Sequence, residues 1–153
     1  MNALELKLPP PLQASLSLLG MWLIARCFPA FDVVFAWHAA LAILLAGIGG
    51  IWLVAGVLAF RRAKTTVNPL TPQATSTLVT SGVYRFSRNP MYVGLLFVLA
   101  GWGSYLANAL ALLVLPLFVA SMTRWQILPE ERIMAAKFGA EFEAYKRSVR
   151  RWL

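Results

Sequence analysis

The stretch that decides the fold is MYVGLLFVLAGWGSYLANALALLVLPLFVASMT, residues Met91–Thr123, which has no charged residue over 33 positions. About 20 apolar residues cross a bilayer as one α-helix, so this run is too long for a single ordinary span. Ser104 and Asn108 lie near its middle, where they favour a turn. The run therefore predicts a helical hairpin with spans near 91–106 and 109–128.

Two further apolar runs precede the hairpin, at residues 12–28 and 33–60. The first is at the lower limit for a span, and the second is long enough to cross with a tilt. Over the whole chain 59% of the residues are apolar and 13% are charged, against roughly 45–50% and about 25% in soluble domains. A soluble domain of this size has too little interior to bury so much apolar surface. We therefore expect one all-α integral membrane domain, residues 1–153, with about four transmembrane helices.

The basic residues indicate the orientation of these helices. The net charge is +8, and most Lys and Arg residues lie in the segment 61–90 and in the C-terminal tail, whereas the link 29–32 has only Asp32. Because cytoplasmic loops are enriched in Lys and Arg, both basic segments and both termini should be cytoplasmic. In a chain this apolar, the expected partner of the positive charge is anionic lipid rather than nucleic acid.

The tail differs from the apolar runs and predicts a C-terminal helix over residues 129–149. Its apolar side chains recur at spacings of three and four residues, which places them on one helix face. They are Met134, Phe138, Phe142, Tyr145, Val149 and Trp152. A basic amphipathic helix of this kind is expected to cover the cytoplasmic face of the bundle.

Several common sites are not indicated by the sequence. With Cys27 as the one cysteine and His38 as the one histidine, a metal site is not expected. The segment Gly47–Gly50 is glycine-rich, but it lies inside a predicted span rather than after a strand. Close helix packing is therefore its expected role.

The first segment with candidate chemistry is Tyr84–Gly94. Pro90 suits the first position of a helix and Asn89 the cap before it, so the third span should begin here. The free N–H groups of that helix end, together with the guanidinium of Arg88, are suited to hold a carboxylate. The ring of Tyr92 is suited to face a cation such as a sulfonium. A capped span with a basic flank explains the same residues, so both interpretations remain open.

The second segment is the pair Glu130 and Glu131, which follows Pro129. Two adjacent carboxylates beside a membrane are suited to bind hydroxyl or ammonium groups. Glutamates are also favoured in the first turn of any helix by the helix dipole. The residues alone favour neither the binding interpretation nor the structural one.

Two stretches together resemble a known family. They are LVTSGVYRFSRNPMYVGLLF (Leu78–Phe97) and PEERIMAAKFGAEFEAYKRSVRRW (Pro129–Trp152), and they resemble small bacterial members of the isoprenylcysteine carboxyl methyltransferase and phospholipid methyltransferase superfamily. The resemblance covers residues 68–152. It implies a helical enzyme of the bacterial inner membrane that uses S-adenosylmethionine. The implied acceptor is lipophilic, with a carboxylate, amine or hydroxyl group, and enters from the bilayer.

The resemblance also implies site residues. Arg88 would orient the acceptor, and the cofactor would be bound by Gly82, Tyr84, Asn89, Pro90, Tyr92, Gly94, Glu130 and Glu131. Two positions depart from the family pattern. Many members have His where Asn89 stands, and Asn cannot titrate. Prenylcysteine enzymes tend to have an arginine shortly before the glutamate pair, whereas this chain has Arg124-Trp125-Gln126 there, with its arginine at a shifted position.

Two other functions remain as alternatives. Membrane sterol reductases have a related C-terminal pattern and bind a nicotinamide cofactor, although this chain is short for that group. A non-catalytic membrane protein on the same fold is the second alternative. The acceptor and the oligomeric state are left open by the sequence.

Overall fold

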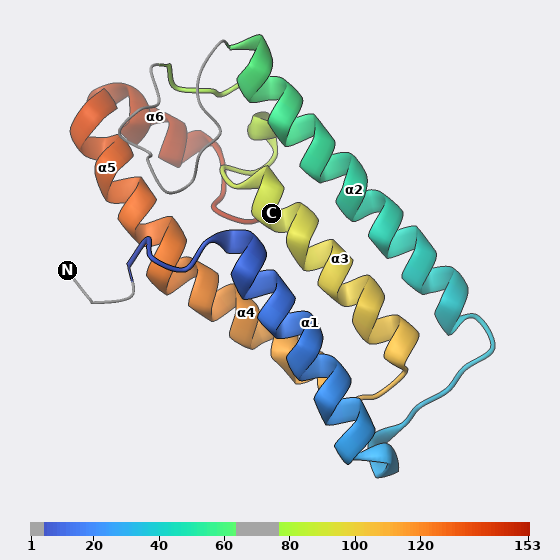
Figure 1. Ribbon diagram of the computed structural model, residues 1–153. Helices are drawn as coiled ribbons and strands as arrows, with labels where there is room; N and C mark the ends of the chain where they lie inside the picture. Colours follow the sequence, from blue (N-terminus) through green and yellow to red (C-terminus); the bar gives the residue numbers. More distant parts are fainter. Residues whose placement is uncertain (1–4, 64–76) are drawn as a thin grey trace.

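The computed structural model describes residues 5–63 and 77–153, and within these residues all regular structure is helical. The long helices are α1 (Pro10–Cys27), α2 (His38–Arg62) and α3 (Pro90–Leu106). They are followed by α4 (Val114–Met122), α5 (Leu128–Phe138) and α6 (Ala140–Ser148). Figure 1 shows α1 to α4 running side by side, with α6 over one end of the bundle. The predicted all-α fold is confirmed.

Two described helices are long and apolar enough to cross a membrane. They are α2, with 25 residues, and the continuous helix Ala111–Phe138, with 28 residues. Large apolar side chains point outward from both, including Ile43, Ile51 and Leu117, which are 76%, 69% and 67% exposed. The helix α3 is apolar but shorter. Outward apolar surface of this kind fits a membrane protein.

The second helix begins later than the sequence predicts, at His38 rather than at Val33. The intervening residues contact the turn after α3 instead. The N–H of Val33 donates to the carbonyl of Ala107 at 2.6 Å, and Asp32 forms an isolated bridge with Asn108. These tertiary hydrogen bonds use the backbone groups that a longer helix would need.

The helices α2 and α3 approach each other closely through small residues. A Cβ atom on Gly49 would lie 2.7 Å from the carbonyl oxygen of Gly94, and one on Gly94 would lie 2.8 Å from that of Gly49. Gly101 makes a similar approach to Ala42. The predicted packing role is therefore confirmed for Gly49. Gly47 has open space beside it.

The predicted hairpin turn lies where α3 ends. Ala107 has a left-handed backbone with φ of 49°. Asn108 is buried, and its amide donates to the carbonyl of Phe28 at 3.0 Å and to the carboxylate of Asp32 at 2.8 Å. Its side-chain oxygen accepts the N–H of Ala111 at 3.0 Å. One buried amide thus fixes both the turn and the link between α1 and α2.

The fourth helix does not end near residue 128 but continues into α5 through a π-helical turn, η5 (Thr123–Ile127). Pro129 follows this turn and has no N–H to give to the carbonyl of Trp125, four residues earlier. That carbonyl instead accepts the N–H of Leu6 at 3.0 Å. The π turn thus lies directly before a proline that could not complete the α-helical hydrogen bond to Trp125.

The predicted C-terminal helix 129–149 is two helices in the structure, because the chain breaks at Gly139. This residue has φ of 49°, which interrupts α-helical geometry between α5 and α6. Phe142 and Tyr145 of the predicted apolar stripe are buried, and Met134, Phe138, Val149 and Trp152 are half-buried. The stripe therefore faces the protein.

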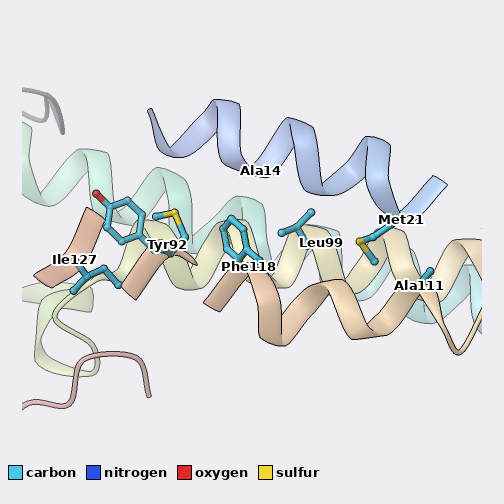
Figure 2. Close-up of a cluster of buried hydrophobic side chains, with 8 residues drawn as sticks. Ala14, Met21, Tyr92, Leu99, Ala111, Phe118 and Ile127 are labelled. Carbon is cyan, nitrogen blue, oxygen red and sulfur yellow. The ribbon is translucent and has the colours of Figure 1, made fainter. Parts of the chain in front are cut away.

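The apolar core lies between α1, α3 and α4, as Figure 2 shows. Its buried members are Ala14, Met21, Tyr92, Leu99, Ala111, Phe118, Met122 and Ile127. The indole N–H of Trp102 donates to the carbonyl of Leu18 at 3.1 Å and links α3 to α1. Tyr92 is at one end of this row, with its hydroxyl at the tip. The core thus leads directly to the candidate site.

Candidate active site

The two segments singled out in the sequence meet at the N-terminal end of α3. The hydroxyl of Tyr92 donates to Oε1 of Glu130 at 2.7 Å. The Nη2 of Arg88 donates to Oε1 of Glu131 at 2.6 Å. Each bond joins two residues that are about 40 positions apart in the chain. Tyr92 and Arg88, both from the segment Tyr84–Gly94, thus contact one glutamate each.

Glu131 is held by two guanidinium groups. Besides the bond from Arg88, it accepts hydrogen bonds from Nε of Arg151 at 3.0 Å and from Nη2 of Arg151 at 2.7 Å. The side chains of Arg88 and Glu131 are 10% and 13% exposed. The hydrogen bonds to Glu131 raise the pKa of the Arg151 guanidinium. Because charge-assisted bonds to a forked donor fix direction as well as distance, Glu131 is rigidly oriented.

Glu130 is bonded by neutral donors. Its Oε1 accepts the hydroxyl of Tyr92 and also the amide of Gln126, which donates from Nε2 at 2.6 Å. Gln126 lies in the π turn and is fully buried. The two adjacent carboxylates therefore differ in environment. Glu131 is paired with cations and Glu130 with uncharged donors.

A C-terminal strap, residues 149–152, crosses the N-terminal end of α3. The Nη1 of Arg88 donates to the carbonyl of Val149 at 2.6 Å, and its backbone N–H donates to that of Arg150 at 2.9 Å. The amide of Asn89 donates to the carbonyl of Arg151 at 2.9 Å. The indole N–H of Trp152 donates to Thr123 at 3.1 Å. The strap is thus bound largely through its own carbonyl groups.

Asn89 occupies the expected cap position of α3, with Pro90 as the first helical residue, but its side chain does not cap the helix. The side-chain amide bonds the strap instead, and the backbone N–H of Asn89 donates to Oγ of buried Ser87 at 3.0 Å. The predicted start of the third span, with Asn89 at the cap position and Pro90 as the first helical residue, is therefore confirmed. The Asn89 side chain connects α3 to the C-terminus.

One nitrogen of the Arg88 guanidinium has no partner in this arrangement. Its Nε is buried and has no hydrogen-bond partner among the described residues. A buried guanidinium N–H without a partner is energetically costly, so such a group favours an incoming acceptor atom.

The remaining predicted site residues are Gly82, Tyr84 and Gly94. Gly82 has φ of 62° in the 3-10 turn η3 (Gly82–Arg85). The carbonyl of buried Tyr84 accepts the hydroxyl of Tyr145 at 2.6 Å, and its ring packs edge-on against Phe60, with 5.3 Å between centroids. Burial raises the pKa of both phenols. Gly94 lies one turn into α3 at the contact with α2.

Other residues considered in the sequence lie elsewhere. Arg124 is exposed and makes no ion pair with a described carboxylate. His38 begins α2 and stacks edge-on with Phe35, at the opposite end of α2 from Arg62. Within the described residues no group of three His, Cys, Asp or Glu side chains is arranged to hold a metal ion.

Arg151, Gln126 and Ser87 were not singled out by the sequence. Arg151 belongs to a basic tail in which every arginine looks alike, so its bidentate pairing gives no local signal. Buried Ser87 donates to the carbonyl of Arg151, which only the folded chain brings near. The partner of buried Gln126 is Glu130, four residues later in the same helix, so the spacing alone could have indicated this pair.

Comparison with known proteins identifies the family of this chain. The family model of phospholipid methyltransferases matches residues 37–141, which include both glutamates and the whole Tyr84–Gly94 segment. The chain belongs to this family. The family points to a methyltransferase of the membrane, and the sequence resemblance to this superfamily is confirmed.

Two relatives extend the comparison. An uncharacterized protein of Haemophilus influenzae is 43% identical over 63 residues, which are 41% of this chain and the whole of that protein. The protein-S-isoprenylcysteine O-methyltransferase of Schizosaccharomyces pombe is 32% identical over 72 residues, which are 47% of this chain and 30% of the yeast enzyme. No solved structure matches this chain.

Proposed function

We propose that this protein transfers a methyl group from S-adenosylmethionine to a lipophilic acceptor at the cytoplasmic surface of a membrane, in bacteria the inner membrane. The observation that supports this most directly is the junction of Tyr92 with Glu130 and of Arg88 with Glu131. It joins the two segments of the family pattern into one polar cluster at the end of an apolar core.

The residues at this junction suit the cofactor. S-adenosylmethionine supplies a methyl group already activated on a sulfonium, together with ribose hydroxyls, an ammonium and a carboxylate. Glu130 and Glu131 would bind hydroxyl or ammonium groups, and the aromatic face of Tyr92 would lie toward the cation. The proposed cofactor-binding residues are Gly82, Tyr84, Asn89, Pro90, Tyr92, Gly94, Glu130 and Glu131. Gly94 contributes by letting α2 approach, since its own Cα faces that helix.

Arg88 is proposed to orient the acceptor. Three hydrogen bonds of its guanidinium already go to Lys146 in α6, to Val149 in the strap and to Glu131. This role therefore depends on Nε, which has no partner among the described residues. An N–H held in place by the rest of the guanidinium would position a carboxylate, hydroxyl or amine without moving. An anionic acceptor needs no base, which fits Asn89 in place of a titratable histidine.

The topology proposed for this reaction has four spans in one domain, with both termini cytoplasmic. The spans are α1, α2, α3 and α4 with η5, and α5 and α6 cover the cytoplasmic face. Arg61, Arg62, the N-terminal end of α3 and the strap lie at one end of the bundle, which would be the cytoplasmic end. Labelling of Ser148→Cys in a Cys27→Ser background tests this orientation. Reaction with an impermeant reagent from outside intact cells would reject it.

The function is tested by calorimetric titration of the detergent-purified protein with S-adenosylhomocysteine and, separately, with NADPH. We expect binding of the first and none of the second. Glu131→Gln should weaken that binding about tenfold or more, because a charge-assisted hydrogen bond contributes about 1.5–3 kcal/mol. Binding of NADPH alone would favour a reductase, and binding of neither would favour a non-catalytic protein.

A further inference from the structure

A half-open groove lies between the C-terminal end of α2 and the turn that leads into α3. Its volume is about 440 Å³. It is lined by Ala55, Leu58, Ala59, Arg62, Ala63, Ser81, Gly82 and Val83. Figure 1 shows this end of α2 beside the short turn before α3. The volume falls in the range of about 300–1,000 Å³ that is usual for small-molecule sites.

The lining of the groove changes from apolar to cationic along α2. Ala55, Ala59 and Ala63 are spaced by four residues and therefore share one face of the helix, where their small side chains leave room. Leu58 and Arg62 form the next row. With a rise of 1.5 Å per residue, Ala55 and Arg62 are about 10 Å apart along the helix axis. If α2 crosses the bilayer with its basic end at the surface, this interval runs from acyl chains to head groups.

Among the described residues, none covers the polar end of the groove. Gly82 is required there by its positive φ and not by crowding, since a Cβ atom would meet no atom of residues 5–63 or 77–153 within 4 Å. Ser81 is exposed beside it and presents a hydroxyl. Arg62 is exposed and forms no ion pair with a carboxylate among residues 5–63 and 77–153. A free guanidinium fork next to a hydroxyl matches the oxygen atoms of a phosphate.

We propose that this groove binds the head group and first acyl carbons of an anionic membrane phospholipid, with Arg62 as the ligand of the phosphate. The apolar floor selects a molecule that lies in the bilayer, and the cationic end selects a negative head group. The site depends on the membrane location of α2 but not on methyl transfer. It adjoins the proposed cofactor site through Gly82.

The test is native mass spectrometry of the full chain with phosphatidylglycerol or phosphatidylcholine in the detergent micelle. Arg62→Gln should lower the apparent affinity for phosphatidylglycerol about tenfold and leave that for phosphatidylcholine nearly unchanged. The neighbouring Arg61→Gln is the matched control, because Arg61 does not line the groove. Ala59→Trp should fill the groove and weaken both lipids. Inorganic phosphate at millimolar concentration should not displace the lipid.

Equal losses from Arg61→Gln and Arg62→Gln would overturn the proposal, because they would indicate a diffuse surface charge. Unchanged lipid binding by Ala59→Trp would also overturn it. Titration of each variant with S-adenosylhomocysteine separates this result from the proposed function. If lipid binding requires Arg62 but the protein binds no S-adenosylhomocysteine, the groove is a lipid site and the proposed methyl transfer is rejected.

Discussion

Arg151 and Glu131, 20 positions apart in the chain, are joined by two hydrogen bonds, at 3.0 Å from Nε and 2.7 Å from Nη2. Lysine keeps the charge but cannot reproduce this fork. We expect Arg151→Lys to weaken S-adenosylhomocysteine binding about fivefold to tenfold, as measured by calorimetry. The exposed neighbour Arg150 provides the control, since Arg150→Lys should bind like the parent. Equal affinities for both variants would show that Glu131 does not need Arg151.

The hydroxyl of Tyr92 can be removed without emptying the core. Tyr92→Phe keeps the ring between its apolar neighbours but loses the 2.7 Å bond to Glu130. We expect cofactor affinity to fall about threefold to tenfold and the free energy of unfolding to change by about 1 kcal/mol. Tyr105→Phe, at the exposed far end of the same helix, should change neither quantity. Parent-like binding by Tyr92→Phe would remove this phenol from the proposed cofactor site.

The contact between α2 and α3 predicts opposite effects for two nearby glycines. Gly49→Ala places a methyl group 2.7 Å from a backbone oxygen, and the helices must separate, at a cost of about 1–3 kcal/mol. Gly47→Ala meets no atom within 4 Å and should be neutral or stabilising by about 0.5–1 kcal/mol. Thermal unfolding in detergent measures both. The same loss of stability in the two variants would contradict the observed helix packing.

The bond from Tyr145 to the carbonyl of Tyr84 predicts a loss of stability at alkaline pH. Burial raises the pKa of Tyr145 above its ordinary value of 10.0. A group whose pKa is raised by folding stabilises the fold below its unfolded pKa, and this contribution is lost as the pH rises above about 10. We expect Tyr145→Phe to be less stable than the parent at pH 8. The difference should shrink and then reverse above about pH 10, as measured by unfolding from pH 8 to about pH 11. A pH-independent difference would show that the phenol is solvated.

The helical class and the hairpin turn were predictable because each has a local signal, whereas a common site for the two motif segments followed from the family resemblance. A charge-free run of 33 residues is longer than one span, and Asn108 supplies the polar turn. Pro90 after Asn89 indicates a helix start by the chemistry of proline alone. The family match then confirmed the resemblance that these segments had suggested.

Other features depend on contacts that no local pattern reports. The late start of α2 follows from hydrogen bonds of Asp32 and Val33 to the turn after α3. The side chain of Asn89 makes no capping hydrogen bond to α3, because its amide donates to the carbonyl of Arg151 in the strap. Among several arginines in the tail, only the folded chain distinguishes Arg151 from Arg150.

The π turn at Thr123–Ile127 also determines which glutamate faces which partner. A π turn holds one residue more than an α-helical turn, and each residue rotates the following helix by about 100°. Removing one residue from this turn would bring Glu131 to the direction that Glu130 now has, facing Tyr92 and Gln126. Glu130 would then take the direction of buried Pro129, and Arg88 and Arg151 would lose their common carboxylate. The length of this turn, and not only the identity of the two glutamates, therefore encodes the site.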